Sequence, residues 1–188
     1  MVQSVIVTIS SSGEVKNFRF ADGVIRSFAR MTYSEVKAIL VDRNQQLRSK
    51  YEALIPSFER MLDLYKVLNS QRKARGAIDF ERADAEVVLD ATGKTINIRA
   101  EERNIAHRII EEFMLLANEV VASYISSQST SCIYRVHEKP DVETVQQLEN
   151  LVQRFGYRLR APSESLVPKM FQKLLASLEG KHEERFIS

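Results

Sequence analysis

The chain has 188 residues, 44% of them apolar and 28% charged, which is enough apolar material for one domain with a hydrophobic core. The formal net charge of +2 is spread over mixed runs of acidic and basic residues, so charge alone does not indicate nucleic-acid binding. A single cysteine excludes a disulfide within the chain and favours the cytoplasm, and the lack of any apolar run near ~20 residues argues against a membrane span.

The first thirty residues predict a β-hairpin. Apolar residues alternate with others through Val5–Ile9, and the turn-forming stretch Ser10–Glu14 follows. A second extended run starts at Val15, and Val24 and Ile25 can prolong it. We therefore expect two antiparallel strands joined by a tight turn.

Helical spacing of apolar residues begins after the hairpin. A short helix is expected just after Thr32 or Ser34, either of which can cap its N-terminus. A longer helix is expected over about Gln46–Arg75, with a break or kink at Pro56 and with Gly76 as its C-terminal cap.

The rest of the chain predicts a second set of strands and helices. We expect an α+β fold in which two β-hairpins and a short strand pack with about five helices. The expected elements are a hairpin within 78–99, a helix over about Glu102–Ser126, a strand over Cys132–Val136, a helix capped by Asp141 and a last helix over about Glu164–Glu179.

The helix over Glu102–Ser126 carries the most informative pattern. It is apolar nearly all round, which predicts burial, yet His107, Glu111 and Asn118 lie on one stripe of it. A carboxylate among apolar neighbours is costly unless it is paired. One interpretation is an ion pair from Glu111 or its neighbour Glu112 to Arg103 or Arg108. The other is a functional site.

Three further positions each have a structural and a functional interpretation. Phe80 is either a core aromatic or a platform on which a base stacks, and Tyr33 has the same two readings, with a hydroxyl that can also bond a sugar. His137 follows the expected strand Cys132–Val136, where a site or an ordinary loop can occur. Cys132 itself is expected to be a small core residue.

No self-sufficient catalytic set is visible in the sequence. The histidines and the cysteine lack the spacing of a zinc site, no glycine-rich phosphate loop is present, and no paired aspartates are placed to hold magnesium. The candidates above are therefore binding groups and not a reaction centre.

Four stretches, in this order and at this spacing, resemble the catalytic RNB domain of the ribonuclease II and ribonuclease R family. They are residues 27–36, 75–81, 106–118 and 134–140. The resemblance covers roughly residues 2–160. It implies a processive 3′→5′ exoribonuclease whose members bind single-stranded RNA in a deep channel and use Mg²⁺ held by aspartates.

The resemblance also assigns roles to particular residues. Phe80 matches an aromatic that stacks on bases near the 3′ end, Tyr33 matches a tyrosine close to the terminal nucleotides, and Glu111 matches a glutamate that contacts RNA through ribose hydroxyls. Only RNA carries the 2′-hydroxyl, so such contacts would discriminate RNA from DNA. His107, Asn118 and His137 are candidates for supporting these side chains.

The resemblance further implies that parts of the family's machinery lie outside residues 1–188. The family's aspartate cluster and the second half of its aromatic clamp precede the matching region, and an arginine motif follows it. The cold-shock and S1 domains are not in this sequence. We therefore expect a partial catalytic domain, truncated at both ends, with no Mg²⁺ ligands of its own and no activity in isolation, whose partners are RNA and the rest of the parent polypeptide.

Two other classes of protein remain open at this point. One is a stand-alone module, without catalytic aspartates, that binds RNA or another protein. The other is a purely structural helical domain, which would be favoured if Glu111 were ion-paired away from any cleft.

Overall fold

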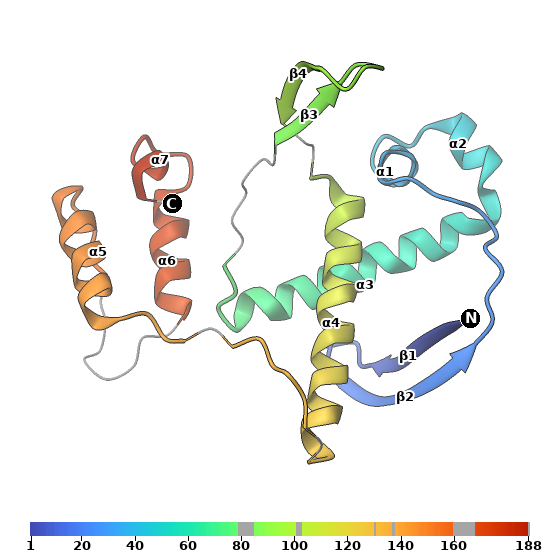
Figure 1. Cartoon of the computed structure of the whole chain (residues 1–188), viewed down its shortest axis with the longest axis horizontal. Coiled ribbons are helices and arrows are strands. Elements are labelled where there is room, and N and C mark those ends of the chain that lie inside the picture. Colours follow the sequence, from blue (N-terminus) through green and yellow to red (C-terminus); the bar gives the residue numbers. More distant parts are fainter. Residues whose placement is uncertain (79–84, 101–102, 130, 137, 160–167, 188) are drawn as a thin grey trace. The chain divides into compact units, whose positions relative to one another are not determined.

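The computed structural model describes residues 1–78, 85–100, 103–129, 131–136, 138–159 and 168–187 (Figure 1). The chain divides into two compact units. The N-terminal unit comprises residues 1–70 and 82–132, and the C-terminal unit comprises residues 71–81 and 133–188.

The N-terminal unit begins with the expected hairpin. Strand β1 (Val2–Ile9) pairs antiparallel with β2 (Val15–Gly23), and the turn between them is closed by the Ser10 amide donating to the Glu14 carbonyl at 2.9 Å. The second strand ends at Gly23, and Val24 and Ile25 are 83% and 70% exposed. The prediction that these two residues prolong the strand is therefore wrong, because they have no partner strand opposite them in the register.

Helix α1 (Tyr33–Leu40) follows, and Thr32 is its N-cap rather than Ser34. Thr32 Oγ1 accepts the Glu35 amide at 3.2 Å, and Glu35 Oε2 accepts the Thr32 amide at 3.1 Å. This reciprocal capping box satisfies two amides that the helix itself leaves unpaired. The bonds from Thr32 lower the pKa of the Glu35 carboxyl below its ordinary value.

The long helix expected over 46–75 is interrupted, as the proline predicts, but the break comes earlier. The segments are α2 (Gln45–Lys50), the 3₁₀ helix η1 (Glu52–Leu54) and α3 (Ile55–Ala74). Pro56 lies in the first turn of α3, where its missing N–H removes no hydrogen bond. The interruption therefore precedes the proline.

Gly76 ends α3 as predicted. Its φ is +101°, its amide donates to the Lys73 carbonyl at 3.0 Å, and the Ala77 amide donates to the Arg72 carbonyl at 3.2 Å. These two bonds form the Schellman arrangement, which requires a left-handed residue at this position and so favours glycine.

The second hairpin is also confirmed. Strand β3 (Ala85–Leu89) pairs antiparallel with β4 (Thr95–Ala100). Asp90 Oδ1 organises the turn by accepting the Thr92 hydroxyl at 2.6 Å and the Lys94 amide at 3.0 Å. These bonds, that of Thr92 first, lower the pKa of Asp90.

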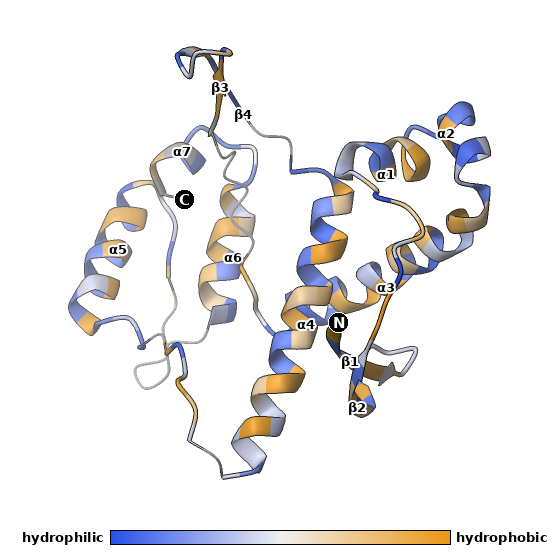
Figure 2. Cartoon of the chain, turned by 45° about the vertical axis from the view of Figure 1, so that its right-hand side comes forward, coloured by the Kyte–Doolittle hydropathy of each residue, from blue (hydrophilic) through white to orange (hydrophobic). Residues whose placement is uncertain are grey.

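Helix α4 (Ile105–Ser127) is the longest element of the N-terminal unit. Figure 2 shows hydrophobic and hydrophilic stretches alternating along it. The buried residues are Ala106, Ile109, Glu112 and Val120, whereas Ile110 and Met114 are 44% and 53% exposed. The prediction of burial all round is therefore wrong, because the other elements of its unit cover only one side of the helix. Its C-terminal end packs through Tyr124 against Phe18 and Phe20 of β2, with ring centroids 5.9 and 4.8 Å apart.

The short strand expected over Cys132–Val136 does not form. Residues 131–136 have no regular secondary structure, Ile133 is fully exposed and Cys132 is exposed, so this cysteine is not a core residue. An apolar run of this length needs a neighbouring strand to hold it extended. The described strands pair only within their own hairpins.

The C-terminal unit contains α5 (Val142–Arg154), α6 (Pro168–Leu178) and α7 (Glu184–Ile187). Asp141 caps α5 as predicted, accepting the Thr144 amide at 3.2 Å. The beginning of the last expected helix, at Glu164, lies outside the described residues, and the described part starts at Pro168.

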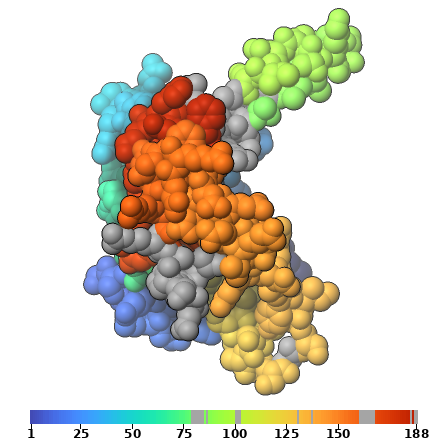
Figure 3. All heavy atoms as spheres, turned by 90° about the vertical axis from the view of Figure 1, so that its left-hand side faces the viewer, coloured from blue at the N-terminus to red at the C-terminus, as the bar shows by residue number. Residues whose placement is uncertain are grey.

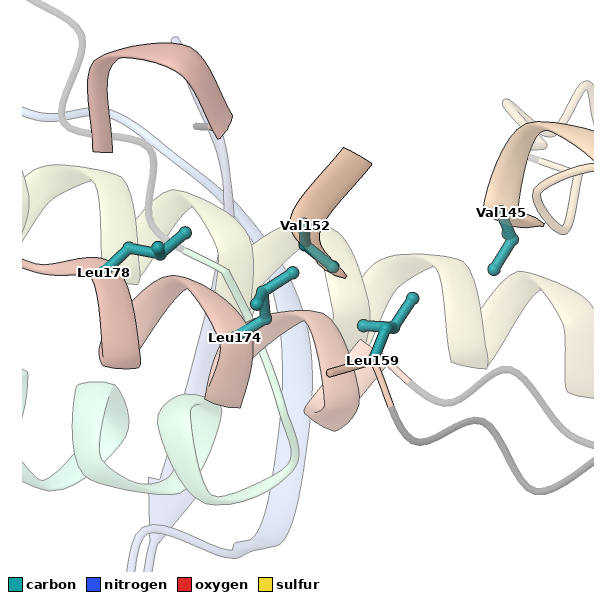
Figure 4. Close-up of a cluster of buried hydrophobic side chains, with 5 residues drawn as sticks. All are labelled: Val145, Val152, Leu159, Leu174 and Leu178. Carbon is teal, nitrogen blue, oxygen red and sulfur yellow. The ribbon is translucent and has the colours of Figure 1, made fainter. Parts of the chain in front are cut away.

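The core of this unit lies between α5 and α6 (Figure 4). In the space-filling view the orange surface of α5 lies against the red surface of the C-terminal helices (Figure 3). The unit is also joined by hydrogen bonds, since Gln172 Nε2 donates to the carbonyls of Lys73 and Ala77, each at 2.9 Å. The buried side chains of this core are Val145, Val152, Leu159, Leu174 and Leu178.

None of the helices among the described residues combines the length and the hydropathy needed to cross a bilayer.

Candidate nucleic-acid interface

Tyr33 and His107 are brought together although 73 positions of sequence lie between them. Tyr33 is the first residue of α1, directly after the capping Thr32, and the residue is 45% exposed. His107 lies in the first turn of α4. Their rings stack, with centroids 3.9 Å apart and planes inclined by 27°. One face of the Tyr33 ring is therefore covered by an imidazole, while nearly half of the residue remains exposed.

The cap of α4 fixes the imidazole of His107. Asn104 is the N-cap, and its Oδ1 accepts the Ala106 amide at 3.0 Å. In return His107 Nδ1 accepts the Asn104 amide at 3.3 Å. The side chain of His107 thus takes the place that a glutamate or glutamine has in the usual capping box.

Glu111 lies one turn further along α4 and is ion-paired. Its Oε2 accepts a hydrogen bond from Arg103 Nη2, and the two side chains are 35% and 33% exposed. The first sequence interpretation, a pair to Arg103 or Arg108, is therefore confirmed for Arg103. The second interpretation, a functional site at Glu111, stays a prediction. Because the pair is partly solvated, it contributes only about 0–1 kcal/mol to stability.

A mostly apolar pocket of about 520 Å³ opens beside Tyr33. It is lined by residues 30–32, by α1 from its first residue to its last, and by α3 and α4, with Arg30 and Thr32 as polar members of the lining. Neither His107 nor Glu111 lines it. The pocket therefore borders the Tyr33 side of the stack. Its apolar lining includes Met31, Tyr33, Phe58, Met61, Ile109 and Ile110.

Glu112 is a buried carboxylate. From the sequence, Glu111 and Glu112 had the same possible ion pair, and the pattern did not show which of the two is buried. Only 4% of the residue is exposed, and its Oε1 accepts a hydrogen bond from Asn69 Nδ2 of α3 at 2.9 Å. The sequence carried a partial signal, because Glu112 stands three positions after the apolar Ile109 and so lies on the same helix face. Its contact fastens α4 to α3 and does not reach the candidate interface.

The remaining candidates are not assembled with this pair of rings. Asn118 is exposed on α4, and at 1.5 Å per residue it lies about 16 Å along the axis from His107. Phe80 and His137 lie outside the described residues. The structure thus joins Tyr33 to His107, with Glu111 one turn away.

The described residues do not form a magnesium site. Within the described ranges, no three histidine, cysteine, aspartate or glutamate side chains lie close enough to share a metal ion. The residues present do not fit the Mg²⁺ that the resemblance implies, so no step through that ion is assigned to them.

The model of the RNB domain matches residues 1–188, the whole chain. The chain belongs to the RNB domain family. Ribonuclease R of Aquifex aeolicus is 39% identical over 98% of this chain and 26% of its own length, and Ribonuclease R of Escherichia coli K12 is 32% identical over 96% and 22%. The family resemblance read from the sequence is thereby confirmed. The chain spans about a quarter of the length of the curated relatives it matches.

Solved structures confirm the α+β fold of this RNB segment. Mycoplasma genitalium RNase R in complex with ribose methylated single-stranded RNA superposes with a TM-score of 0.86 at 20% identity, over 99% of this chain and 29% of that one. The same protein in complex with double-stranded RNA matches equally well, covering 34% of that chain.

Proposed function

We propose that this chain is part of the catalytic domain of a processive 3′→5′ exoribonuclease that hydrolyses single-stranded RNA, and that it supplies one wall of the RNA channel. The observation that carries the proposal is the RNB match over residues 1–188. The relatives named Ribonuclease R support it, as do RNase R structures in complex with RNA that share the fold.

Tyr33 is proposed as one RNA contact. Its ring has the two properties that a stacking or sugar-binding aromatic needs: one face is held by another ring, and 45% of the residue remains accessible. Its hydroxyl can bond a ribose. Phe80 is proposed as a second stacking residue on the basis of the family resemblance.

Glu111 is proposed as the contact to ribose hydroxyls, and its ion pair is compatible with that role. A carboxylate offers about four acceptor positions, and the bond from Arg103 occupies one, on Oε2. A ribose hydroxyl can therefore bond the carboxylate while Arg103 remains paired. Arg103 would also bring a positive charge to the same place, where a phosphate can meet it.

The isolated chain is proposed to be inactive. The intact enzyme would use Mg²⁺ held by aspartates outside this sequence, and no substitute set is present among the described residues. Metal-assisted hydrolysis would then require the rest of the parent polypeptide.

The test measures binding of a labelled single-stranded RNA to the purified chain. Phe80→Ala should weaken binding by about 1–3 kcal/mol, the usual contribution of one stacked base. Glu111→Gln should reduce the preference for an RNA over the same strand ending in deoxyribose, because the lost contact is to the sugar. The matched control is Glu119→Gln, an exposed glutamate on the same helix, which should leave that preference unchanged.

Catalysis is tested in parallel. The chain should release no nucleotides from a 3′-ended strand in Mg²⁺, whereas the parent polypeptide should. Release of nucleotides by the chain alone, if a chelator abolished it, would contradict the proposal that the Mg²⁺ ligands lie in the rest of the parent polypeptide. RNA binding by a parent polypeptide that never degrades RNA would favour a non-catalytic binding module instead.

A further inference from the structure

We infer that His107 is a positioning residue that holds the ring of Tyr33 in the orientation in which it meets RNA. The inference rests on the proposed RNA contact of Tyr33. It concerns a residue that makes no proposed contact with RNA itself. His107 would act through the stack alone.

His107 is suited to this role because its imidazole is fixed at an edge and on a face. At the edge, Nδ1 accepts the Asn104 amide at 3.3 Å. An acceptor nitrogen carries no proton, so in the neutral ring the proton is on Nε2. On the face, the Tyr33 ring lies 3.9 Å away at 27°. A ring held in both ways has little freedom to rotate and forms a firm support.

Tyr33 needs such a support. It is the first residue of its helix and is 45% exposed, so its own helix gives the ring few neighbours. A free ring would lose conformational freedom on binding RNA, and a ring already held by a neighbour has lost it beforehand. Stacked aromatic pairs shift equilibria by about two- to tenfold, which sets the size of the expected effect on RNA affinity.

A simpler explanation is that His107 only caps α4. Two substitutions separate the roles. His107→Gln keeps a side-chain acceptor for the Asn104 amide, as in ordinary capping boxes, but has no ring. His107→Phe keeps a ring for Tyr33 but has no acceptor. If His107 only caps α4, the His107→Phe variant should be the one that binds RNA more weakly. If His107 positions Tyr33, the His107→Gln variant should be the one that binds RNA more weakly.

The experiment measures the affinity of the chain for single-stranded RNA by fluorescence anisotropy. His107→Gln should bind about two- to tenfold more weakly than the wild type, while His107→Phe should stay within about twofold. In a Tyr33→Ala background, His107→Gln should cause no further loss. Urea unfolding of each variant, followed by circular dichroism, separates a loss of affinity from a loss of fold.

The stack is also tested without RNA. The ring-current shifts of the Tyr33 ring protons should disappear in His107→Gln and persist in His107→Phe. If Tyr33→Ala weakens binding but folded His107→Gln does not, the inference is wrong and the proposed function stands. Additive losses in the double variant would also overturn it, because His107 would then act without Tyr33. If Tyr33→Ala has no effect on affinity, the proposed contact itself fails.

Discussion

The buried pair Asn69–Glu112 offers a sharp test of what joins α3 to α4. Glu112 is 4% exposed, and Asn69 Nδ2 donates to its Oε1 at 2.9 Å from 43 positions earlier in the chain. Asn69→Ala removes this donor. Hydrogen bonds to charged groups contribute about 1.5–3 kcal/mol, so we expect the N-terminal unit to lose about that much stability. Glu112 keeps a further interaction, so the larger cost of about 3–5 kcal/mol for a fully unpaired buried charge does not apply.

The assay is urea unfolding by circular dichroism, with hydrogen exchange of the α4 amides to assign the loss to this unit. Asn118→Ala is the matched control, since Asn118 is an exposed asparagine on α4, and it should change stability by no more than about 0.5 kcal/mol. In a Glu112→Gln background the cost of Asn69→Ala should fall to about 0.5–1.5 kcal/mol, because the acceptor is then neutral. Equal effects of the two alanine variants, or an undiminished cost in that background, would refute the reasoning.

Two further predictions concern the ends of helices. Gly76→Ala should destabilise the C-terminal unit by more than about 1–2 kcal/mol, because the residue has φ +101° and a Cβ would lie 2.9 Å from the Lys169 amide nitrogen. Gly156→Ala, at φ +84° with open space around it, should cost less in the same urea titration, and equal costs would exclude the clash. Bonds from Thr32 lower the pKa of Glu35 below its ordinary value in the folded chain. The stabilisation by the charged carboxylate is therefore complete above the ordinary pKa of a glutamate and is lost as the pH falls through the lower, folded pKa. The difference in urea midpoint between wild type and Glu35→Gln should therefore be largest near neutral pH and shrink in acid, and a difference independent of pH would contradict this origin.

The sequence by itself determined the elements whose causes are local. Both hairpins turn at runs of small and polar residues, and the bonds that close them span at most a few positions, as between Asp90 and Lys94. Caps are equally local, which is why Asp141 and Gly76 could be assigned before any fold was known. The order and spacing of four stretches also identified the family, which the comparisons confirmed.

Local pattern was misleading where a segment needed a distant neighbour. Residues 132–136 have the composition of a strand, yet a strand exists only when another backbone satisfies its amides and carbonyls. Helix α4 reads as buried on all sides because its composition is apolar. Burial depends on what packs against it, and Ile110 and Met114 remain exposed.

The candidate interface shows most clearly which features the local sequence determines and which depend on distant parts of the chain. The sequence selected Tyr33, His107 and Glu111 as residues with unusual chemistry for their places, but it left Glu111 with two interpretations. Only the tertiary structure decided that Glu111 pairs with Arg103, that its neighbour Glu112 is buried against Asn69, and that the rings of His107 and Tyr33 stack. The stack and the Asn69 contact join residues 74 and 43 positions apart. The geometry of such contacts is set by how the helices cross, and no spacing along the chain encodes it.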